Sequence, residues 1–480
     1  MTDHFDLMIP DVEHSDSRLE VNAPFDGQFI ATIETADQKS VEKALSTAHA
    51  LFRDRSRWLS VEQRVVVLRK TAELMELQSE TLALEAAREG GKPLQDSRVE
   101  VARAIDSVRS CIECLRTGAG KEIPMERNAG SGHRLAFTSH EPIGPVVAVS
   151  AFNHPLNLIV HQITPAIAAG NPVIVKPAED TPLSCYRFVS LLREAGLPDS
   201  WCQALVVNDL DVATALVTDR RVAFFSFIGS AKVGWMLRSK LAPGARCALE
   251  HGGAAPVIVE ADADLDKAIP LLAKGGFYHA GQVCVSVQRV FCHKSIAREV
   301  AERLANAAQR MKVGDPLSED TEVGPLIRQR EVDRVHEWVV EARDAGAGIL
   351  AGGDAISSSC YPPTVIYNAP NEVRVSQQEI FGPVICVYSY EDVNSAISLA
   401  NALPFAFQAA VFTCDIDKAF YASRRLDASA VMVNDHTAFR VDWMPFAGLR
   451  QSGLGTGGIP YTFHEMQIEK MVVVHSESIE

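Results

Sequence analysis

Three side chains that suit covalent chemistry on a carbonyl group lie in short segments rich in glycine or proline. Cys284 lies in GQVCVSVQR, Glu250 precedes two glycines in LEHGGAAP, and Asn153 lies in AFNHPLN. A thiolate adds to a carbonyl carbon, an amide N–H stabilises the resulting oxyanion, and a carboxylate activates water. Each residue also has an ordinary structural explanation, because a single cysteine is more often a core thiol and a glutamate is usually exposed or paired.

Other segments have the composition of a dinucleotide-binding site. VAFFSFIGSAKVG passes from a β-rich run into a helical pattern, and the N–H groups at a helix start suit a pyrophosphate. GSAKVG departs from the usual G-x-G-x-x-G spacing, so it is weak evidence alone. NPVIVKPAED ends a second strand, and QEIFGPV and PFAGLRQSGLG follow later in the chain. The candidate residues in these segments are Lys176, Glu179, Gly229, Ser230, Glu379 and Phe381.

The pattern of elements that must position these residues changes along the chain. Residues 38–118 have apolar residues at spacings of three and four, which predicts helices, and Gly90-Gly91 ends the second run. From residue 144, short β-rich runs alternate with helical patterns, and a second series follows residue 285. This alternation predicts two α/β domains on parallel sheets, with a boundary near residue 253.

Taken together and in this order, the motifs resemble those of the aldehyde dehydrogenase superfamily, from near residue 20 to the C-terminus. The resemblance implies an α/β fold of two parallel-sheet domains and a small oligomerisation element. The Rossmann-like cofactor domain would comprise residues 1–119 and 141–252, and the catalytic domain residues 253–463. The oligomerisation element would comprise residues 120–140 and 464–480.

The resemblance also implies roles for the first three residues. Cys284 matches the nucleophile, which forms a thiohemiacetal and then a thioester. Asn153 matches the side-chain oxyanion donor, with the Cys284 backbone N–H as its partner, and Glu250 matches the general base. CoA-acylating members generally lack this glutamate, so Glu250 favours a free carboxylic acid as product. The rival hypotheses are a CoA-acylating semialdehyde dehydrogenase, a scaffold that kept the fold, and an esterase that uses the same thiol.

The cofactor expectation is NAD, with NADP as the alternative. Lys176 and Glu179 match the adenosine-ribose contacts, and a carboxylate there opposes a 2′-phosphate. Gly229 and Ser230 would face the pyrophosphate. Three further residues match contacts near the nicotinamide: Gly252, Glu379 and Phe381. The sequence departs from the family pattern at Ile228, His251, Ala254, Ala447 and Arg450, none of which removes a catalytic group.

The predicted substrate pocket is polar. In the family the helix after the asparagine lines the pocket, and here that segment contains His154, Asn157 and His161. Asn153, Asn157 and His161 fall on one helical face, and Arg440 lies on the loop before the Pro445 motif. We therefore expect a short, anionic aldehyde, as in the lactaldehyde, phosphonoacetaldehyde and semialdehyde branch. The alternatives are that His161 is a satisfied core histidine and that Arg440 pairs with Asp442.

Composition limits the other classes of function. The net charge of −15 without a basic patch disfavours nucleic-acid binding. The ten cysteines show no paired metal spacing, and Cys111 and Cys114 form a lone CxxC in a helical stretch, so we expect no metal. Neither an apolar leader nor a run of about 18 apolar residues is present, so we expect a cytoplasmic protein without a membrane span.

The C-terminal KMVVVHS predicts a strand without an obvious local partner. An apolar strand with an open edge is a liability unless something covers it. Pairing with another subunit, in a homodimer or homotetramer, is the favoured hypothesis. Return of the strand to its own sheet is the alternative.

Overall fold

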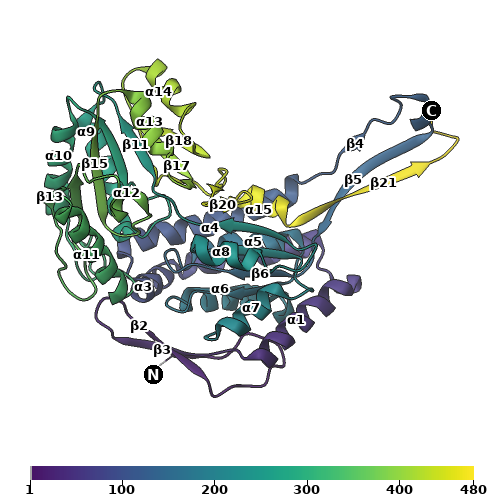
Figure 1. The fold of residues 1–480 in the computed structure, drawn as a ribbon. Helices are drawn as coiled ribbons and strands as arrows, with labels where there is room; N and C mark the ends of the chain where they lie inside the picture. Colours follow the sequence, from purple (N-terminus) through teal and green to yellow (C-terminus); the bar gives the residue numbers. More distant parts are fainter. Residues whose placement is uncertain (1–2, 480) are drawn as a thin grey trace.

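A six-stranded sheet organises the larger lobe of the computed structural model, which describes residues 3–479 (Figure 1). Its order is β20-β10-β9-β6-β7-β8, and every neighbouring pair is parallel except β10 with β20. The strands are β6 (Val146–Val149), β7 (Val173–Lys176), β8 (Cys202–Ala204), β9 (Phe224–Ile228), β10 (Arg246–Glu250) and β20 (Gly453–Leu454).

Helices cover both faces of this sheet, because side chains alternate between the faces along each strand. On one face, Val146 and Ala148 pack into a core with α2 (Val61–Leu77), α3 (Ser79–Gly90), α4 (Leu94–Thr117), α5 (Asn157–Ala169) and α6 (Leu183–Glu194). On the other face, Val147 packs with α1 (Gln38–Arg53), α7 (Leu210–Thr218) and α8 (Ala231–Arg238). The helices predicted over residues 38–118 are therefore present.

Gly91 explains the end of the second helical run. Its φ is +71°, and a Cβ there would press against the rings of Pro24 and Pro325. Only glycine adopts this backbone without strain, so α3 stops and the chain turns into α4.

The second lobe contains a seven-stranded sheet of order β13-β14-β15-β12-β11-β17-β18, parallel except for β13. The strands are β11 (Pro256–Val259), β12 (Arg289–His293), β13 (Gly348–Ala351), β14 (Thr364–Tyr367), β15 (Val384–Tyr390), β17 (Gln408–Phe412) and β18 (Ala430–Val433). The helices are α9 (Leu265–Phe277), α10 (Ala297–Arg310), α11 (Gln329–Asp344), α12 (Arg374–Gln377), α13 (Val393–Asn401) and α14 (Ile416–Ser423). The predicted fold class, two parallel-sheet α/β units, is confirmed.

Smaller elements complete the chain. A three-stranded sheet near the N-terminus contains β1 (Asp3–Phe5), β2 (Arg18–Asn22) and β3 (Phe29–Glu34), and β16 (Phe405–Ala406) pairs with β19 (Leu449–Arg450). Four short 3-10 turns are η1 (Arg55–Arg57), η2 (Ala129–Ser131), η3 (Asp199–Trp201) and η4 (Tyr278–Gly281). β20 and α15 (Ile459–Glu465) return to the first lobe, where α15 packs against α4 and α5. This part of the predicted catalytic segment therefore lies on the first sheet.

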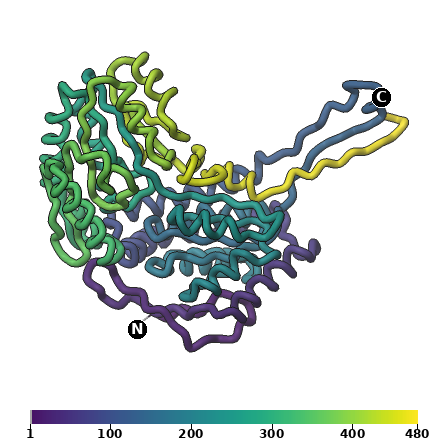
Figure 2. Tube along the Cα trace, viewed as in Figure 1, coloured from purple at the N-terminus to yellow at the C-terminus, as the bar shows by residue number. Residues whose placement is uncertain are grey.

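An arm projects from the two lobes, on the side opposite the N-terminus (Figure 2). It consists of β4 (Glu122–Ile123), β5 (Arg134–Pro142) and β21 (Gln467–His475), and β21 runs antiparallel to β5 from Gln467↔Pro142 to His475↔Arg134. The C-terminal strand thus finds its partner within its own chain, as the alternative hypothesis held. Its outer edge pairs with no strand of residues 3–479.

The chain between residues 3 and 479 contains no helix that combines the length and the apolar character needed to cross a bilayer.

Candidate active site

The loop before Cys284 has an unusual backbone. His279, Ala280 and Gly281 have φ values of 48°, 53° and 67° in succession. A Cβ at Gly281 would overlap the Gly382 carbonyl, and the two non-glycine residues cost about 1–2 kcal/mol each in this conformation. The side chain of Gln282 holds the turn, because it donates to the Pro325 carbonyl at 3.3 Å and accepts from the Ile327 N–H at 3.0 Å.

Asn153 lies against this loop. It is buried between β6 and α5, and its Nδ2 donates to the Gln282 carbonyl oxygen at 2.9 Å. Phe152 beside it packs edge-on against Phe381, with ring centroids 5.9 Å apart. The structure therefore brings the predicted oxyanion donor to the predicted nucleophile across 131 residues of sequence, from 153 to 284.

The paired glycines after Glu250 allow a carboxyl group to rest on the backbone. The Gly253 N–H donates to Glu379 Oε1 at 3.2 Å, and a Cβ on Gly252 would overlap that carboxyl group. A Cβ on Gly253 would lie 3.8 Å from the Cys284 carbonyl oxygen. Glu379 comes from the second lobe and Gly252 from the end of the first sheet, so the site forms where the lobes meet.

Burial and one cation control the ionisation of the reacting groups. Burial raises the pKa of the Cys284 thiol to about 12 and the pKa of Glu379 to about 8, and it also raises the pKa of Glu250. The positive charge of Arg440 opposes the shift at both Cys284 and Glu250. Burial thus favours the neutral thiol of Cys284, whereas the charge of Arg440 favours its thiolate.

Asp442 organises the predicted substrate side of the site. Arg103 donates to its two oxygens from Nε at 3.0 Å and Nη2 at 2.7 Å, and His161 Nε2 lies 2.8 Å from Oδ1. Asn157 Nδ2 donates to the same oxygen at 3.3 Å. These donors hold the pKa of Asp442 far below its usual range despite its burial.

Arg440 has fewer partners than Arg103. Its Nη2 lies 3.4 Å from His161 Nδ1, its Nε is 4.0 Å from Asp442 Oδ1, and its guanidinium carbon is 3.6 Å from the centre of the Phe446 ring. Both ring nitrogens of His161 are therefore occupied, so His161 orients neighbouring groups. The alternative, an ion pair between Arg440 and Asp442, is met only at 4.0 Å, the longest N···O distance that still counts as an ion pair.

Four of the cofactor candidates lie at the carboxyl ends of two strands of the first sheet, β7 and β9. Lys176 ends β7, and it pairs with Glu179 in the loop that follows at 2.8 Å. Gly229 and Ser230 form the turn between β9 and α8, and the Ser230 side chain does not cap the helix. The N–H groups of Ala231 and Lys232 at the start of α8 bond to no residue of the described chain, so they can bind an anionic group. The donor set fits a dinucleotide.

Known proteins resemble this chain over nearly its whole length. The family model described as the aldehyde dehydrogenase family matches residues 12–472. The chain belongs to the aldehyde dehydrogenase family. It is 37% identical to a 3-sulfolactaldehyde dehydrogenase of Priestia megaterium, with 96% of each chain covered.

Two solved structures support this membership. Aldehyde dehydrogenase 21 of Physcomitrella patens, in complex with its reaction product succinate, is 33% identical, with a TM-score of 0.95 and 100% and 99% of the chains covered. A glyceraldehyde-3-phosphate dehydrogenase of Methanocaldococcus jannaschii, complexed with NADP, is also 33% identical, with a TM-score of 0.91 and coverage of 96% and 100%.

One departure from the family pattern has a packing explanation. His251 is buried between the rings of Phe227 and Trp235, and its Nδ1–H donates to the Gly229 carbonyl at 2.8 Å. A Cβ on Gly234 would overlap the His251 ring. The imidazole thus fills space that α8 leaves beside the cofactor turn.

This packing predicts the effect of Gly234→Ala. The added methyl group should displace His251 and lower the free energy of unfolding by about 1–3 kcal/mol, as overpacking does. Chemical denaturation measures the loss, and the KM for NAD should rise because the turn at Gly229 shifts. Gly132→Ala is the control, because a Cβ at Gly132 meets no atom within 4 Å. Equal losses in the two variants would contradict the prediction.

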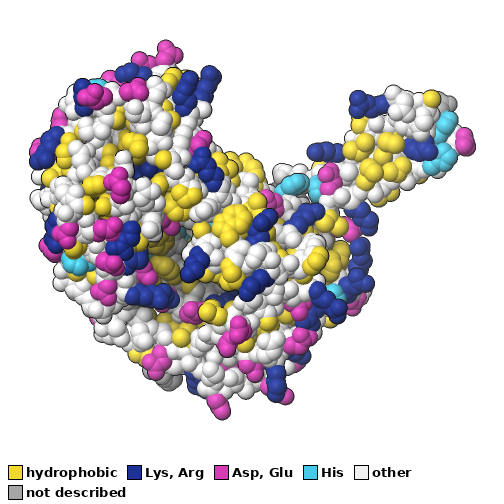
Figure 3. All heavy atoms as spheres, viewed as in Figure 1, with side chains coloured by type: hydrophobic (Ala, Val, Ile, Leu, Met, Phe, Trp, Pro, Cys, Tyr) yellow, Lys and Arg dark blue, Asp and Glu magenta, His cyan; other side chains and the backbone are white. Residues whose placement is uncertain are grey.

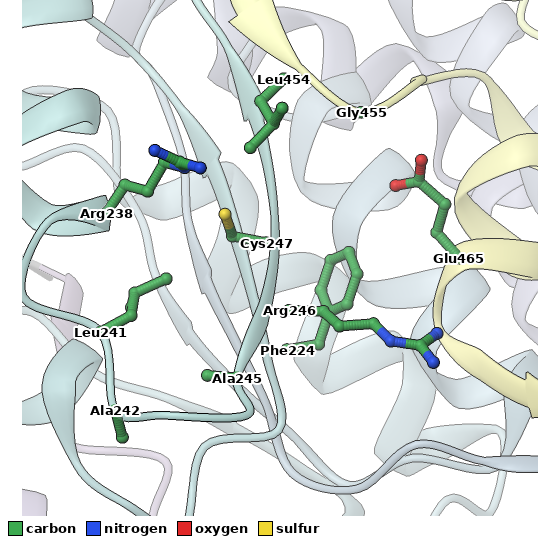
Figure 4. A pocket seen from close by; sticks show the side chains of 10 residues that line it. All are labelled: Phe224, Arg238, Leu241, Ala242, Ala245, Arg246, Cys247, Leu454, Gly455 and Glu465. Carbon is green, nitrogen blue, oxygen red and sulfur yellow. The ribbon is translucent and has the colours of Figure 1, made fainter.

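A separate cavity of about 640 Å³ lies among β10, α8 and α15 (Figure 4). Its lining includes Cys247, Arg238, Arg246 and Glu465, and it contains none of the predicted catalytic residues. The active site of this aldehyde dehydrogenase is therefore not this cavity, although a cysteine lines it.

Sequence reasoning missed the residues that α4 contributes. Lys92 and Glu100 form a buried ion pair, and Arg103 holds Asp442. A signal was present, since Asp96, Glu100 and Ser107 alternate with apolar residues on the buried face of an amphipathic helix. Charged groups on a core-facing stripe are costly unless they have partners, which marks such a helix as part of a site.

Proposed function

We propose that this aldehyde dehydrogenase oxidises a short aldehyde with an anionic group to the free carboxylic acid, with NAD as the oxidant. The observation that supports the anionic group is the state of Arg440. Its side chain is 10% exposed, it lies within electrostatic range of Cys284, and its Nε is buried without a hydrogen-bond partner among residues 3–479. A buried guanidinium with unused donors is a binding site for an oxyanion.

The contacts with Asp442 differ between the two arginines. Arg103 donates two hydrogen bonds to the Asp442 carboxylate, whereas Nε of Arg440 lies 4.0 Å from Oδ1. Arg440 therefore retains positive charge beside the reacting groups. A carboxylate, phosphonate or sulfonate accepts two parallel N–H bonds from such a group. The Priestia relative is named for a sulfonated aldehyde, and the Physcomitrella structure contains a dicarboxylate.

The covalent step uses Cys284. The Sγ atom adds to the aldehyde carbon as the thiol proton passes to water, and the oxyanion accepts N–H bonds from Asn153 and from the Cys284 backbone. A bound nicotinamide would supply the hydride acceptor, and loss of hydride would leave a thioester on Cys284. Glu250 then takes a proton from water, which attacks the thioester carbon, and the carboxylic acid leaves as the thiol is restored. Burial raises the pKa of Glu250, which suits a general base near neutral pH.

Several residues would hold the dinucleotide. The open N–H groups at the start of α8 suit the pyrophosphate, and Lys176 with Glu179 suits the adenosine ribose. Gly252, Glu379 and Phe381 would lie near the nicotinamide. Because the Glu179 carboxylate repels a 2′-phosphate, we propose NAD rather than NADP, although the Methanocaldococcus relative is complexed with NADP.

The rival functions predict different requirements. A CoA-acylating enzyme forms product only with CoA, whereas Glu250 supports hydrolysis of the thioester by water. An esterase using Cys284 would act without a dinucleotide, and a scaffold would give no NADH. A stoichiometric burst of NADH on mixing with aldehyde, followed by turnover without CoA, separates these four functions.

Arg440→Ala tests the anionic substrate. Loss of this cation should lower the ratio of kcat/KM for anionic over neutral aldehydes by about 10- to 100-fold, mainly through KM, as charged hydrogen bonds are worth about 1.5–3 kcal/mol. Steady-state kinetics on carboxylate-, phosphonate- and sulfonate-bearing aldehydes, against propanal and benzaldehyde, measures the ratio. The effect of Arg440 on the Cys284 pKa is common to both sets, so it cancels.

Two variants control this test. Arg440→Lys keeps the charge and should lose less of the ratio. Arg109→Ala removes an arginine that pairs with Glu76 on the protein surface, and it should leave the ratio unchanged. A wild-type preference for the apolar aldehydes would refute the anionic substrate.

The arm supports assembly with a second copy of the chain. Its exposed apolar side chains alternate between the two faces of the β5–β21 ribbon, and Figure 3 shows an apolar patch on the face in view. These side chains are Leu135, Phe137, Met471, Val472, Val473 and Val474. The open edge of β21 leaves backbone groups for another strand. We propose that these features form a homodimer or homotetramer contact, and light scattering of the intact chain reads the subunit number.

A further inference from the structure

Lys92, Glu100 and His154 form a buried cluster of ionisable side chains. His154 directly follows Asn153 in the chain. Lys92 pairs with Glu100, and both side chains are 1% exposed. Lys92 Nζ also lies 2.7 Å from His154 Nδ1. Neither Lys92 nor Glu100 has a role in the chemistry above. Taking such a pair out of water is expensive, so its retention in the core suggests a task beyond stability.

Glu100 fixes the position of His154 through the backbone. Its Oε1 accepts the N–H groups of Leu156 at 3.0 Å and Asn157 at 2.9 Å, where α5 begins. α5 has no side-chain N-cap of its own, so Glu100 supplies the cap from another helix. The segment 153–157 is thereby held against α4.

Lys92 determines which ring nitrogen of His154 carries the proton. An ammonium group only donates, so Nδ1 of His154 must accept and the imidazole proton must lie on Nε2. The His154 side chain is 13% exposed, and Nε2 has no hydrogen-bond partner among residues 3–479. The free end of the ring is therefore an N–H donor.

We propose that the Lys92–Glu100 pair is a positioning device that holds His154 as a neutral Nε2–H donor, which binds an oxygen on the carbon next to the reacting carbonyl. His154 directly follows the oxyanion donor Asn153, and the charges of Arg103 and Arg440 both reach it. For an aldehyde whose carbonyl binds at Asn153 and whose anion binds at Arg440, we place the carbon next to the reacting carbonyl at His154. This inference rests on the proposed function and specifies its substrate class as 2-hydroxyaldehydes.

The surroundings keep His154 neutral. The groups that face it are Lys92, Glu100 and Arg103 from the α4 region, Tyr278 and His279 from η4, and Arg440 from the loop after β18. Burial and the cations Lys92, Arg103 and Arg440 hold its pKa well below the usual range, although the Glu100 carboxylate lies 3.9 Å from Nδ1. The donor thus stays in one protonation state through neutral pH.

The experiment compares two sulfonated aldehydes that differ only in the 2-hydroxyl group, 3-sulfolactaldehyde and 3-sulfopropanal. In the wild type, kcat/KM should favour the hydroxylated aldehyde by about tenfold, the effect of one hydrogen bond. His154→Leu should abolish the preference, and His154→Gln, which can still donate, should keep part of it. An equal loss with both aldehydes would overturn the proposal, because His154 would then bind the anion.

Lys92→Met separates positioning from a structural role. Without the ammonium group, the Glu100 carboxylate attracts the proton to Nδ1 of His154, and Nε2 becomes an acceptor. The preference for the hydroxylated aldehyde should fall at neutral pH and return towards acid pH, because the pKa of His154 rises and protonation restores the Nε2–H donor. The double variant Lys92→Met/Glu100→Gln removes that attraction and keeps an amide oxygen for the helix cap. It should recover the preference to within about threefold of the wild type.

A purely structural pair predicts the opposite order, with the double variant no better than the single one, and that result would refute the proposal. Activity with 3-sulfopropanal reports whether each variant has folded. Lys274→Met is the matched control. Lys274, on α9, pairs at 2.7 Å with the buried Asp96, which lies on α4 as Glu100 does, and Lys274 does not bond to His154. It should leave the preference and the pH profile unchanged.

If neither sulfonated aldehyde reacts, the proposed anionic substrate fails, and lactaldehyde against propanal then tests His154 by itself. A preference for lactaldehyde that His154→Leu abolishes would support the inference. The absence of that preference would overturn it.

Discussion

Replacing Cys284 with alanine is expected to abolish the NADH burst and to lower kcat by at least about 10³-fold, because hydride then has to leave from a free aldehyde carbon. No thiohemiacetal forms without the Sγ atom, so neither hydride release nor a thioester follows. Stopped-flow absorbance of NADH on mixing enzyme, NAD and aldehyde measures the burst. Dinucleotide binding, read by fluorescence titration, should persist, since Cys284 does not hold the cofactor domain together.

Cys247→Ala provides the matched control for this prediction. Cys247 is a half-buried thiol with a raised pKa, as Cys284 is, but it lines the separate cavity of Figure 4. It should retain the wild-type burst and turnover. A burst that survives Cys284→Ala and disappears in Cys247→Ala would assign the nucleophile to the other cysteine.

Replacing Glu250 with glutamine should separate the two halves of the reaction. The thiohemiacetal can form and lose hydride, so one equivalent of NADH should appear. Turnover should then fall by about 10²- to 10⁴-fold, because no carboxylate activates water. Intact-protein mass spectrometry should detect the acyl group on Cys284.

The pH dependence follows from the direction of the Glu250 pKa. Burial raises this pKa, and the base acts only when deprotonated, so wild-type deacylation slows as pH falls through the raised pKa. Glu250→Gln should lack this acid limb. The control is Glu85→Gln, since Glu85 is also a partly buried carboxyl with a raised pKa but pairs with Arg187 at 2.9 Å. Full turnover of Glu250→Gln with water would remove Glu250 from this role.

The active site also shows why the arginines differ in function. Asp442 neutralises Arg103 through two short bonds and holds His161 in place, which leaves Arg440 to act on Cys284, Glu250 and the substrate. Under the proposed function, a single cation would therefore both favour the Cys284 thiolate and bind the anion. Substrates without a negative charge would leave Arg440 buried and poorly compensated, which is a physical basis for specificity.

Much of this protein was evident in its amino-acid sequence. The alternation of β-rich runs with helical patterns predicted two parallel-sheet units, since such a sheet needs helices on both faces. The motifs around Cys284, Glu250 and Asn153 predicted the family, which the comparisons confirm. These features are local, because a strand, a glycine turn or a motif is defined by residues adjacent in the chain. The roles of the individual residues stay predictions, which the variants above test.

Only the tertiary structure shows which distant side chains form ion pairs and hydrogen bonds with each other. The sequence by itself determined that a thiol, an amide and a carboxylate lie in turns suited to carbonyl chemistry. It did not show that Arg103 takes Asp442, that Lys92 and Glu100 lie behind His154, or that β21 returns to β5. Each of these contacts joins residues more than 50 positions apart, and their energies depend on distance and burial, which only the folded chain sets. The candidate nucleophile could therefore be predicted from the sequence, whereas the side chains that surround it required the fold.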